Sequence, residues 1–239
     1  MRKSRPSLKL PRLQRPSSAP RDARVVVIDR VGVSIRGELE EAGVRLTQLT
    51  WDLRGRLTWE KPFDREGRAH GLERELDGGR VSWQVPWSRG TMHGLARQFD
   101  ATGRCVMRSR FVRGRGVDVF CDVVEGVVAI AELREIDETL HGLERWGPPD
   151  RPYEEGHYAR GQRHGVFRRW RKDVLEIDYP RYFVNGVQTS RDAYRRQRRR
   201  MPELPADRRR DDHPVRPLPS CLTDGSVWIR RSTRVPRAD

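Results

Sequence analysis

Cysteine is scarce in this sequence of 239 residues, which holds only Cys105, Cys121 and Cys221. The three are far apart and form neither a Cys-x-x-Cys pair nor a zinc-ligand spacing, so the sequence indicates reduced thiols rather than a disulfide framework. Long hydrophobic runs are missing too, because stretches such as 25–28 and 127–131 are far shorter than a membrane span. We therefore expect a cytoplasmic protein without a transmembrane segment.

The N-terminal segment lacks the hydrophobic centre of a secretory signal. Residues 1–24 are rich in arginine, contain serine and have a single acidic residue, so an organelle transit peptide stays an alternative. Four prolines at positions 6, 11, 16 and 20 argue against an amphipathic helix there. We favour a disordered basic tail.

Motifs of known enzyme classes are also absent. The chain has no Gly-x-Ser-x-Gly, no P-loop and no His-Glu-x-x-His, and its carboxylates are scattered. We therefore expect no catalytic residues, no cofactor and no enzymatic activity. An enzyme with a site in residues 25–42 is a remote alternative.

The net charge of +15 is concentrated at the two ends of the chain. Residues 1–24 hold eight basic residues and one acidic one, and residues 190–239 hold fourteen and seven. The middle, 25–189, is nearly balanced, with twenty-seven and twenty-six. A nucleic-acid binder usually carries its basic surface on a folded face, so charge on tails predicts at most nonspecific, salt-sensitive binding.

A short motif recurs along the middle of the chain. Gly-x-x-His-Gly occurs at 67–71, 90–94 and 161–165; residues 138–142 keep its second half and 114–118 its first. The histidine position falls at 70, 93, 117, 141 and 164, which gives steps of 23 or 24 residues. An aromatic residue stands three positions before the corner glycine, and a second glycine lies mid-repeat at 55, 79 and 103. The chain therefore contains a repeat of about six copies.

Each copy alternates apolar and polar residues between glycines, as in residues 81–88. Period-two alternation with glycine at the corners predicts a β-hairpin. A hydrophobic content of 35% is low for a two-layer core of this length and fits a shallow, repetitive fold. We predict an all-β protein, a single-layer antiparallel meander of stacked β-hairpins with a short C-terminal capping helix and disordered basic tails. The residues expected to build the repeat are Gly67, His70, Gly71, Trp87, Gly90, His93, Gly94, Phe111, Gly114, His141, Gly142, Tyr158, Gly161, His164 and Gly165.

The spacing aromatic-x-x-Gly-x-x-His-Gly, followed by an apolar run and a mid-repeat glycine, resembles the MORN repeat in the divergent form common in bacteria. The resemblance covers residues 43–188, although 114–137 lacks His-Gly and "WGPPDRP" interrupts the fifth copy at 146–152. It implies a hairpin array that acts as a scaffold or binds partner proteins, and bacterial variants often carry an antitoxin or immunity label.

The remaining segments complete the predicted organisation. Residues 25–42 are an N-terminal strand or cap before the array at 43–188. Ser190 is a good helix N-cap, and 191–200 predict a short arginine-rich helix that ends before Pro202, within a capping segment of 189–201. Residues 202–239 are rich in proline and arginine and predict a largely disordered tail, in which 226–232 are able to add a strand or serve as a short linear motif.

Two sets of polar residues are candidates for a site. The His-Gly histidines lie two strands apart in successive hairpins, about 9–10 Å, which is too far to share a zinc ion, so we expect structural corner residues and no metal site. His-Gly-x-x-Arg recurs at Arg74, Arg97, Arg145 and Arg168. These arginines either pair with acids such as Glu75 or Glu144 or line a groove for an acidic peptide or phosphate.

The sequence therefore predicts a non-enzymatic interaction module whose partner is another protein, with an antitoxin-like role as one form of it. The alternative is nucleic-acid or anionic-lipid binding through the basic tails. In that case residues 25–189 alone would lose most of the affinity.

Overall fold

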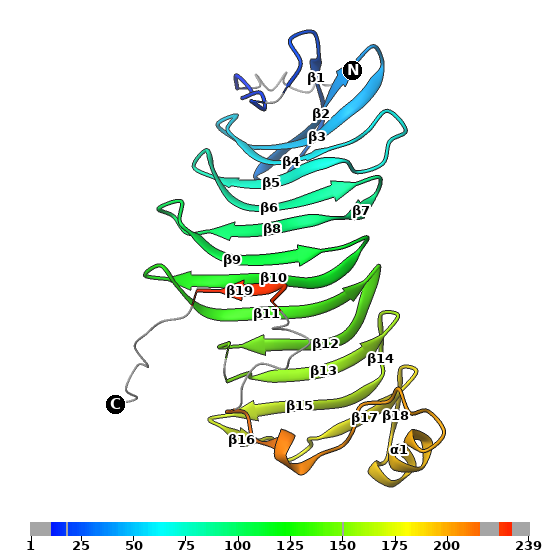
Figure 1. Cartoon of the computed structure of the whole chain (residues 1–239). Coiled ribbons are helices and arrows are strands. Elements are labelled where there is room, and N and C mark those ends of the chain that lie inside the picture. Colours follow the sequence, from blue (N-terminus) through cyan, green and yellow to red (C-terminus); the bar gives the residue numbers. More distant parts are fainter. Residues whose placement is uncertain (1–10, 18, 150, 216–224, 231–239) are drawn as a thin grey trace, which may run out of the picture. The chain divides into compact units, whose positions relative to one another are not determined.

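The computed structural model of the chain describes residues 11–17, 19–149, 151–215 and 225–230. Residues 1–10, 216–224 and 231–239, which the sequence places in tails, lie outside the described residues. The chain divides into two compact units, residues 1–90 and 91–239. Figure 1 labels the elements of both.

The first unit consists of hairpin-linked antiparallel strands that pair in chain order. The strands are β1 (Arg24–Val31), β2 (Ser34–Glu41), β3 (Val44–Asp52), β4 (Leu57–Pro62), β5 (Gly71–Asp77) and β6 (Arg80–Ser88). The expected cap at 25–42 is thus a hairpin of the same kind as those that follow it.

The second unit contains two groups of antiparallel strands and one α-helix. One group has the order β8-β9-β19, and the other has the order β10-β11-β12-β13-β15-β17-β18. The elements are β7 (Thr91–Met92), β8 (Gly94–Phe99), β9 (Cys105–Phe111), β10 (Arg115–Val124), β11 (Val127–Asp137), β12 (Thr139–Gly147), β13 (Glu154–Ala159), β14 (Gln162–Arg163), β15 (Gly165–Arg171), β16 (Val174–Leu175), β17 (Arg181–Val184), β18 (Val187–Thr189), helix α1 (Arg191–Arg198), the 3-10 helix η1 (Arg209–Asp212) and β19 (Val227–Ile229). The predicted all-β fold of hairpin-linked antiparallel strands is confirmed.

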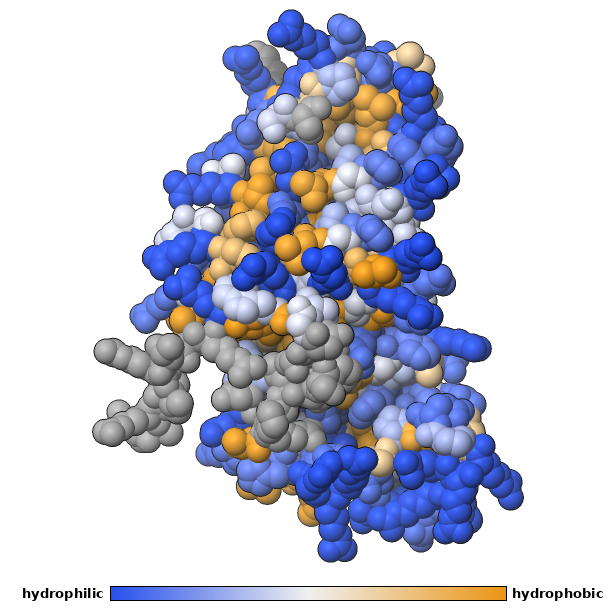
Figure 2. Space-filling view, in the orientation of Figure 1, coloured by the Kyte–Doolittle hydropathy of each residue, from blue (hydrophilic) through white to orange (hydrophobic). Residues whose placement is uncertain are grey.

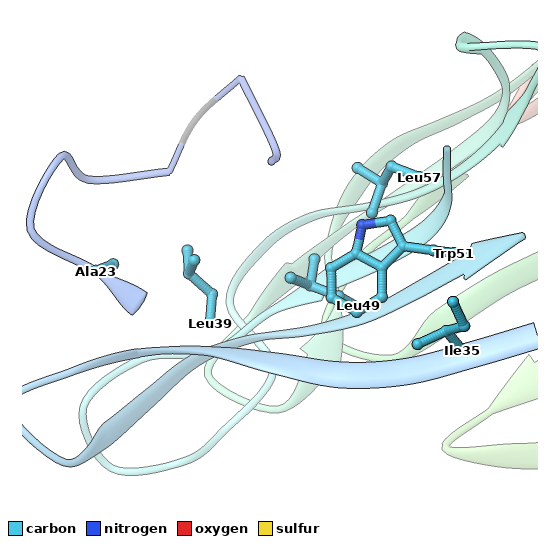
Figure 3. Packing of buried hydrophobic residues seen from close by; sticks show 6 residues of the cluster. All are labelled: Ala23, Ile35, Leu39, Leu49, Trp51 and Leu57. Carbon is cyan, nitrogen blue, oxygen red and sulfur yellow. The ribbon is translucent and has the colours of Figure 1, made fainter. Parts of the chain in front are cut away.

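The core of the first unit lies where residues N-terminal to β1 pack against β2–β4. Figure 3 shows the Trp51 ring among its buried neighbours Ala23, Ile35, Leu39, Leu49 and Leu57. The Trp51 indole N–H donates to the carbonyl of Gln14 at 2.7 Å, and the Gln14 N–H donates to the carbonyl of Gly55 at 2.8 Å. The described part of 11–24 is therefore bound to the strands, which differs from the expected disordered tail, because it supplies the cover for an apolar sheet face.

Helix α1 has the expected place and N-cap, with the Ser190 hydroxyl accepting a hydrogen bond from Ala193 N–H at 3.3 Å. Its Tyr194 is fully buried with Val166, Tyr182, Val184 and Leu204. Leu204 belongs to the predicted C-terminal tail, as does Pro205, whose carbonyl accepts from the Tyr194 hydroxyl at 2.7 Å. The described part of 202–215 is thus folded over the helix, which departs from the expected disorder. Strand β19 pairs with β9, in agreement with a strand within 226–232.

The corner glycines end two-residue turns in which both residues have positive φ. Arg89-Gly90, Arg113-Gly114, Arg160-Gly161 and Asn185-Gly186 share this conformation, which matches the twist of the strands they join. Gly67 differs, because it ends a longer turn in which its N–H donates to Asp64 O at 3.0 Å. The expected equivalence of Gly67 with the other corners therefore needs correction: it precedes His70 by the same spacing but belongs to a different turn.

Candidate functional site

The four His-Gly histidines connect one turn to the next. In each, Nδ1 accepts a hydrogen bond from the backbone N–H that precedes the next corner glycine. The pairs are His70 with Arg89 at 3.4 Å, His93 with Arg113 at 3.2 Å, His141 with Arg160 at 3.4 Å and His164 with Asn185 at 3.2 Å. Throughout the described residues, no group of three or more His, Cys, Asp or Glu side chains is placed to hold a metal ion. The geometry supports the structural interpretation of these histidines.

The glycine after each histidine lies directly opposite an aromatic residue of the next strand. The cross-strand pairs are Gly71 with Trp87, Gly94 with Phe111, Gly142 with Tyr158 and Gly165 with Phe183. These glycines have φ between +109° and +148°, a conformation that favours glycine. The recurring residues of the sequence therefore form one recurring contact.

The candidate arginines mostly face carboxylates. Arg74 pairs with the buried Glu60, and burial raises the pKa of Glu60 although Arg74 opposes the rise. Arg97 is half-buried on β8, directly opposite Arg108 on β9. Arg74 and Arg97 thus belong to different units, and Arg74 pairs with Glu60 rather than with the expected Glu75.

Arg145 and Arg168 are both only 1% exposed and lie on either side of Glu155, on neighbouring strands. Their guanidinium nitrogens are 4.0 and 3.9 Å from the Glu155 carboxylate, and Arg168 also donates to Asp212 at 2.9 Å. Two of the four arginines are therefore inside the protein and cannot line an open groove for an acidic peptide. Arg145 and Arg168 instead pair with acidic residues, which was the other interpretation of the sequence, and the acids are Glu155 and Asp212 rather than the expected Glu144.

The first unit has a row of tryptophan and glutamate side chains on one sheet face. Trp59, Glu75 and Trp83 are directly opposite one another on β4, β5 and β6, so they share a face. On the same face, the indole N–H groups of Trp59 and Trp87 donate to the Glu73 carboxylate at 3.0 and 2.7 Å. Lys61 lies 3.9 Å from the centre of the Trp87 ring and 3.1 Å from the same carboxylate. In the first unit the Trp87 ring and the Glu73 carboxylate are thus already occupied by a cation of the same chain, Lys61.

A similar row in the second unit is more open to solvent. Phe120, Glu132, Trp146 and Glu154 are directly opposite one another on β10, β11, β12 and β13. Paired residues of neighbouring strands lie about 5 Å apart, so aromatic rings and carboxylates alternate along this line. Phe120 is 53% exposed and Trp146 45% exposed. We call these four residues the aromatic–acidic row.

A hollow of about 390 Å³ adjoins the aromatic–acidic row. Its lining contains Glu132, Trp146 and Glu154 from the row, together with Glu144, Glu155, Gly156 and Phe167. Gly156 makes the floor possible, because a side chain there would come within 2.2 Å of the Phe167 ring. Burial and a hydrogen bond to Glu144 raise the pKa of Tyr158, beside the hollow, to about 12. The floor is therefore apolar and its sides carry carboxylates.

The rings of the aromatic–acidic row differ from several other aromatic rings of the chain. Basic side chains lie over Phe63, Trp87, Phe167, Tyr179, Phe183 and Trp228, at 3.9 to 5.6 Å from the ring centres. Within the described parts of the chain, no lysine or arginine is placed over Phe120 or Trp146. Trp146 makes an edge contact with Tyr153 at 5.1 Å. Two exposed rings beside glutamates are thus open to a cation from outside, and of these glutamates Glu154 also pairs with Arg169 at 2.9 Å.

A second charged surface lies on α1 and the segment after it. Asp207 accepts from Arg191 at 2.7 Å and lies 3.1 Å from Arg195, so these two arginines are paired with a buried carboxylate. Burial by itself would raise the pKa of Asp207, but the hydrogen bond and the two positive charges lower it below its usual value. Exposed arginines remain on the outer side at positions 196, 199, 200, 208, 209 and 210. This surface has the chemistry of an anion-binding patch.

Sequence reasoning missed the aromatic–acidic row. Its four residues come from four strands, and the repeat spacing does not show which residues are opposite one another. The alternation of apolar and polar residues in 115–124 and 127–137 is enough to place Phe120 and Glu132 on strands. The pairing register of these two strands depends on the turn between them, and that turn lacks the His-Gly signal.

Comparisons with known proteins give no family for the chain. No family model matches it, and no curated protein matches it. Among solved structures, a chain of the "Crystal structure of accessory secretory protein 1,2 and 3 in Streptococcus pneumoniae" is 17% identical with a TM-score of 0.29. That match covers 41% of this chain and 18% of the other, and it is too slight to indicate fold or function.

The hydrophobic residues on the face in Figure 2 occur in small groups between hydrophilic ones.

In the part of the chain that the structure describes, no helix has the length and apolar character needed to cross a membrane.

Proposed function

We propose that this chain is a non-enzymatic hairpin-repeat protein of MORN-like type that binds another protein, and that the aromatic–acidic row is its binding site. The partner contributes an extended segment with arginine or lysine. One cation lies over Trp146, between the carboxylates of Glu132 and Glu154, and another lies over Phe120, beside Glu132. The observation that carries this proposal is the alternation of exposed rings and carboxylates over four adjacent strands.

The local carboxylates and the exposed rings of the row both support a cationic ligand. A cation over an exposed aromatic ring gains about 0.5–1 kcal/mol, and neighbouring carboxylates add charge-assisted hydrogen bonds. The protein itself carries a net charge of +15, which repels basic peptides at long range. If a basic peptide binds, the binding must therefore come from a local site, because the net charge of the protein does not attract the peptide.

The test is binding of a fluorescent nine-residue peptide with three arginines, compared with the same peptide carrying glutamate instead. We expect Trp146→Ala, and separately the double variant Glu132→Gln with Glu154→Gln, to weaken binding at least fivefold. The matched control is Glu125→Gln with Glu203→Gln, which changes the charge equally at two exposed positions. Equal weakening in both double variants would overturn the site, because the effect would then follow net charge alone. Absence of binding to the wild type would overturn the basic-partner proposal itself.

A second function, binding of polyanions such as nucleic acid, is favoured by the exposed arginines of α1 and the segment after it. Tyr194, the one aromatic residue of the helix, is fully buried. The helix therefore has no exposed aromatic residue for stacking on bases or for insertion into a bilayer. Any such binding would be electrostatic and independent of sequence.

An antitoxin-like or immunity role would be one form of protein binding. No described feature favours it over other partners, and the aromatic–acidic row defines only the chemistry of the segment that binds.

A further inference from the structure

Strands β9 and β10 separate soon after the turn that joins them. The only bridge between them in the described residues is Val112 with Arg115, next to the Arg113-Gly114 turn. Beyond it, backbone groups of β10 that would otherwise pair with β9 are bound by side chains. The Gln98 amide both donates to Cys121 O at 2.6 Å and accepts from Cys121 N–H at 2.9 Å. The Ser109 hydroxyl donates to the Val117 carbonyl.

These side chains leave the outer edge of β9 available to another strand. A buried backbone polar group without a partner costs roughly 1–3 kcal/mol, so a separation inside a sheet requires such substitutes. Gln98 and Ser109 provide them for β10. The backbone N–H and C=O groups on the outer edge of β9 do not pair with β10, so they require another strand as partner.

That strand comes from the C-terminal end of the chain. In β19, Val227 is opposite Ser109, Trp228 opposite Arg108 and Ile229 opposite Met107. The ladder continues on both sides, with Arg110 N–H donating to Ser226 O at 2.9 Å and Arg230 N–H donating to Val106 O at 2.7 Å. Residues 226–230 thus bind the β9 edge as an extended peptide.

Side chains add specificity to this backbone ladder. Ile229 is 9% exposed, so it is nearly buried. The Arg108 guanidinium lies 4.7 Å from the centre of the Trp228 ring, which stays 41% exposed. Arg230 O also accepts from Val128 N–H of β11 at 3.2 Å. Main-chain hydrogen bonds with alternate side-chain contacts are the general mode of strand addition.

We propose that the β9 edge is a strand-addition site, that residues 226–230 are its resident ligand, and that the ligand it takes in exchange is the same segment of a second copy of this chain. A second copy is the occupant because its segment matches the edge in sequence and register. Ten residues, 216–225, lie between Val215 and Ser226, and the eleven Cα–Cα steps reach roughly 36 Å when extended. The resident segment competes as an intramolecular ligand at an effective concentration on the order of millimolar, so exchange needs concentrated protein.

The test uses the full chain with proline at two adjacent positions. Ser226 and Arg230 lie at hydrogen-bonded positions of the ladder, so by alternation the Trp228 N–H faces β9 and the Val227 N–H faces away. Trp228→Pro therefore breaks the resident strand, and Val227→Pro is the matched control. The probe is a labelled peptide with the sequence of residues 224–232, measured by fluorescence anisotropy. We expect Trp228→Pro to bind it at least tenfold more tightly than wild type or Val227→Pro.

The second measurement is light scattering after gel filtration, from micromolar to millimolar protein. Wild type and Val227→Pro are expected to dimerise at high concentration, whereas Trp228→Pro stays monomeric because no copy has an intact strand. A Trp228→Pro chain with the wild-type circular dichroism spectrum and no gain in peptide affinity would overturn the strand-addition site. Wild type that stays monomeric throughout, or Trp228→Pro that still dimerises, would overturn exchange with a second copy.

Discussion

Single residues show why the sequence repeat has its particular spacing. Each His-Gly histidine accepts a backbone hydrogen bond from the next turn, and each following glycine faces the aromatic residue that precedes that turn. The step of 23 or 24 residues is the length of one repeat, so the same two contacts recur from one repeat to the next. The periodicity was therefore sufficient to predict the hairpins. It was not sufficient to predict the hydrogen-bond partners of the histidines, because those depend on which ring nitrogen faces the turn.

His164 and His93 form a matched pair for measuring this contact. Both accept a backbone N–H at 3.2 Å, from Asn185 and Arg113, but His164 is buried and His93 is exposed. We expect His164→Ala to lower the free energy of unfolding by about 1–3 kcal/mol, because the Asn185 N–H is left without an acceptor away from water. His93→Ala should cost less than about 1 kcal/mol, because water replaces the ring. Urea unfolding followed by circular dichroism measures both, and equal losses would contradict the role of burial.

Elements at the two ends of the strand array were predicted less well than the array. The sequence correctly places α1 through the Ser190 cap and the proline that follows, because both signals are local. Residues 11–23 and 202–215 were expected to be disordered because their composition is polar and rich in arginine and proline. Their contacts depend on a few residues only: the Gln14 backbone bonds Trp51 and Gly55, and Leu204 and Pro205 contact α1. Such isolated anchors do not change the average composition of a segment.

The contact between α1 and residues 204–207 should depend on pH through Asp207. Its side chain is 2% exposed, and its pKa in the folded protein lies below the usual value. A carboxyl whose pKa is lowered by folding contributes stability above its unfolded pKa of about 3.9, and this contribution is lost as the pH falls through the folded value. We expect Asp207→Asn to lower the unfolding free energy by about 1–3 kcal/mol at pH 7.

The difference between wild type and Asp207→Asn should shrink steadily below about pH 4, where the wild-type carboxyl also becomes neutral. Urea titrations at several pH values measure it, with Asp173→Asn, a more exposed acid that pairs with Arg151 at 3.1 Å, as the control. A difference that is the same at pH 7 and pH 3 would show that the charge of Asp207 does not hold this contact.

At the scale of the whole molecule, the chain combines nearly neutral strands with basic residues at its ends. The sequence was enough to predict this charge map and the all-β class, because both follow from composition and period. It was not enough to predict the aromatic–acidic row or the strand exchange site, because both depend on which strands are neighbours. Phe120 and Glu154 are 34 positions apart yet belong to one row, and Met107 and Ile229 are more than a hundred apart yet lie opposite each other on paired strands.

The folded ends also change how the charge should be tested. Removing residues 1–24 and 190–239 would delete Ala23, Tyr194 and Leu204 from the two cores, so lost binding would also report lost structure. Substitution at the surface avoids this. Arg196→Gln, Arg199→Gln and Arg200→Gln together remove three exposed charges from α1 and its end while leaving Tyr194 and Asp207 in place.

If the chain binds polyanions, this triple variant should bind a twenty-nucleotide single-stranded DNA more weakly. Its plot of log affinity against log salt should be shallower by up to about 2, because each lost phosphate contact removes roughly 0.7 from the slope. The control replaces three exposed arginines at turns of the array, Arg54, Arg65 and Arg104, and changes the net charge equally. Fluorescence anisotropy at four salt concentrations gives both slopes. Equal changes in the two triple variants would mean that binding follows net charge over the whole molecule, and α1 would then have no special part in it.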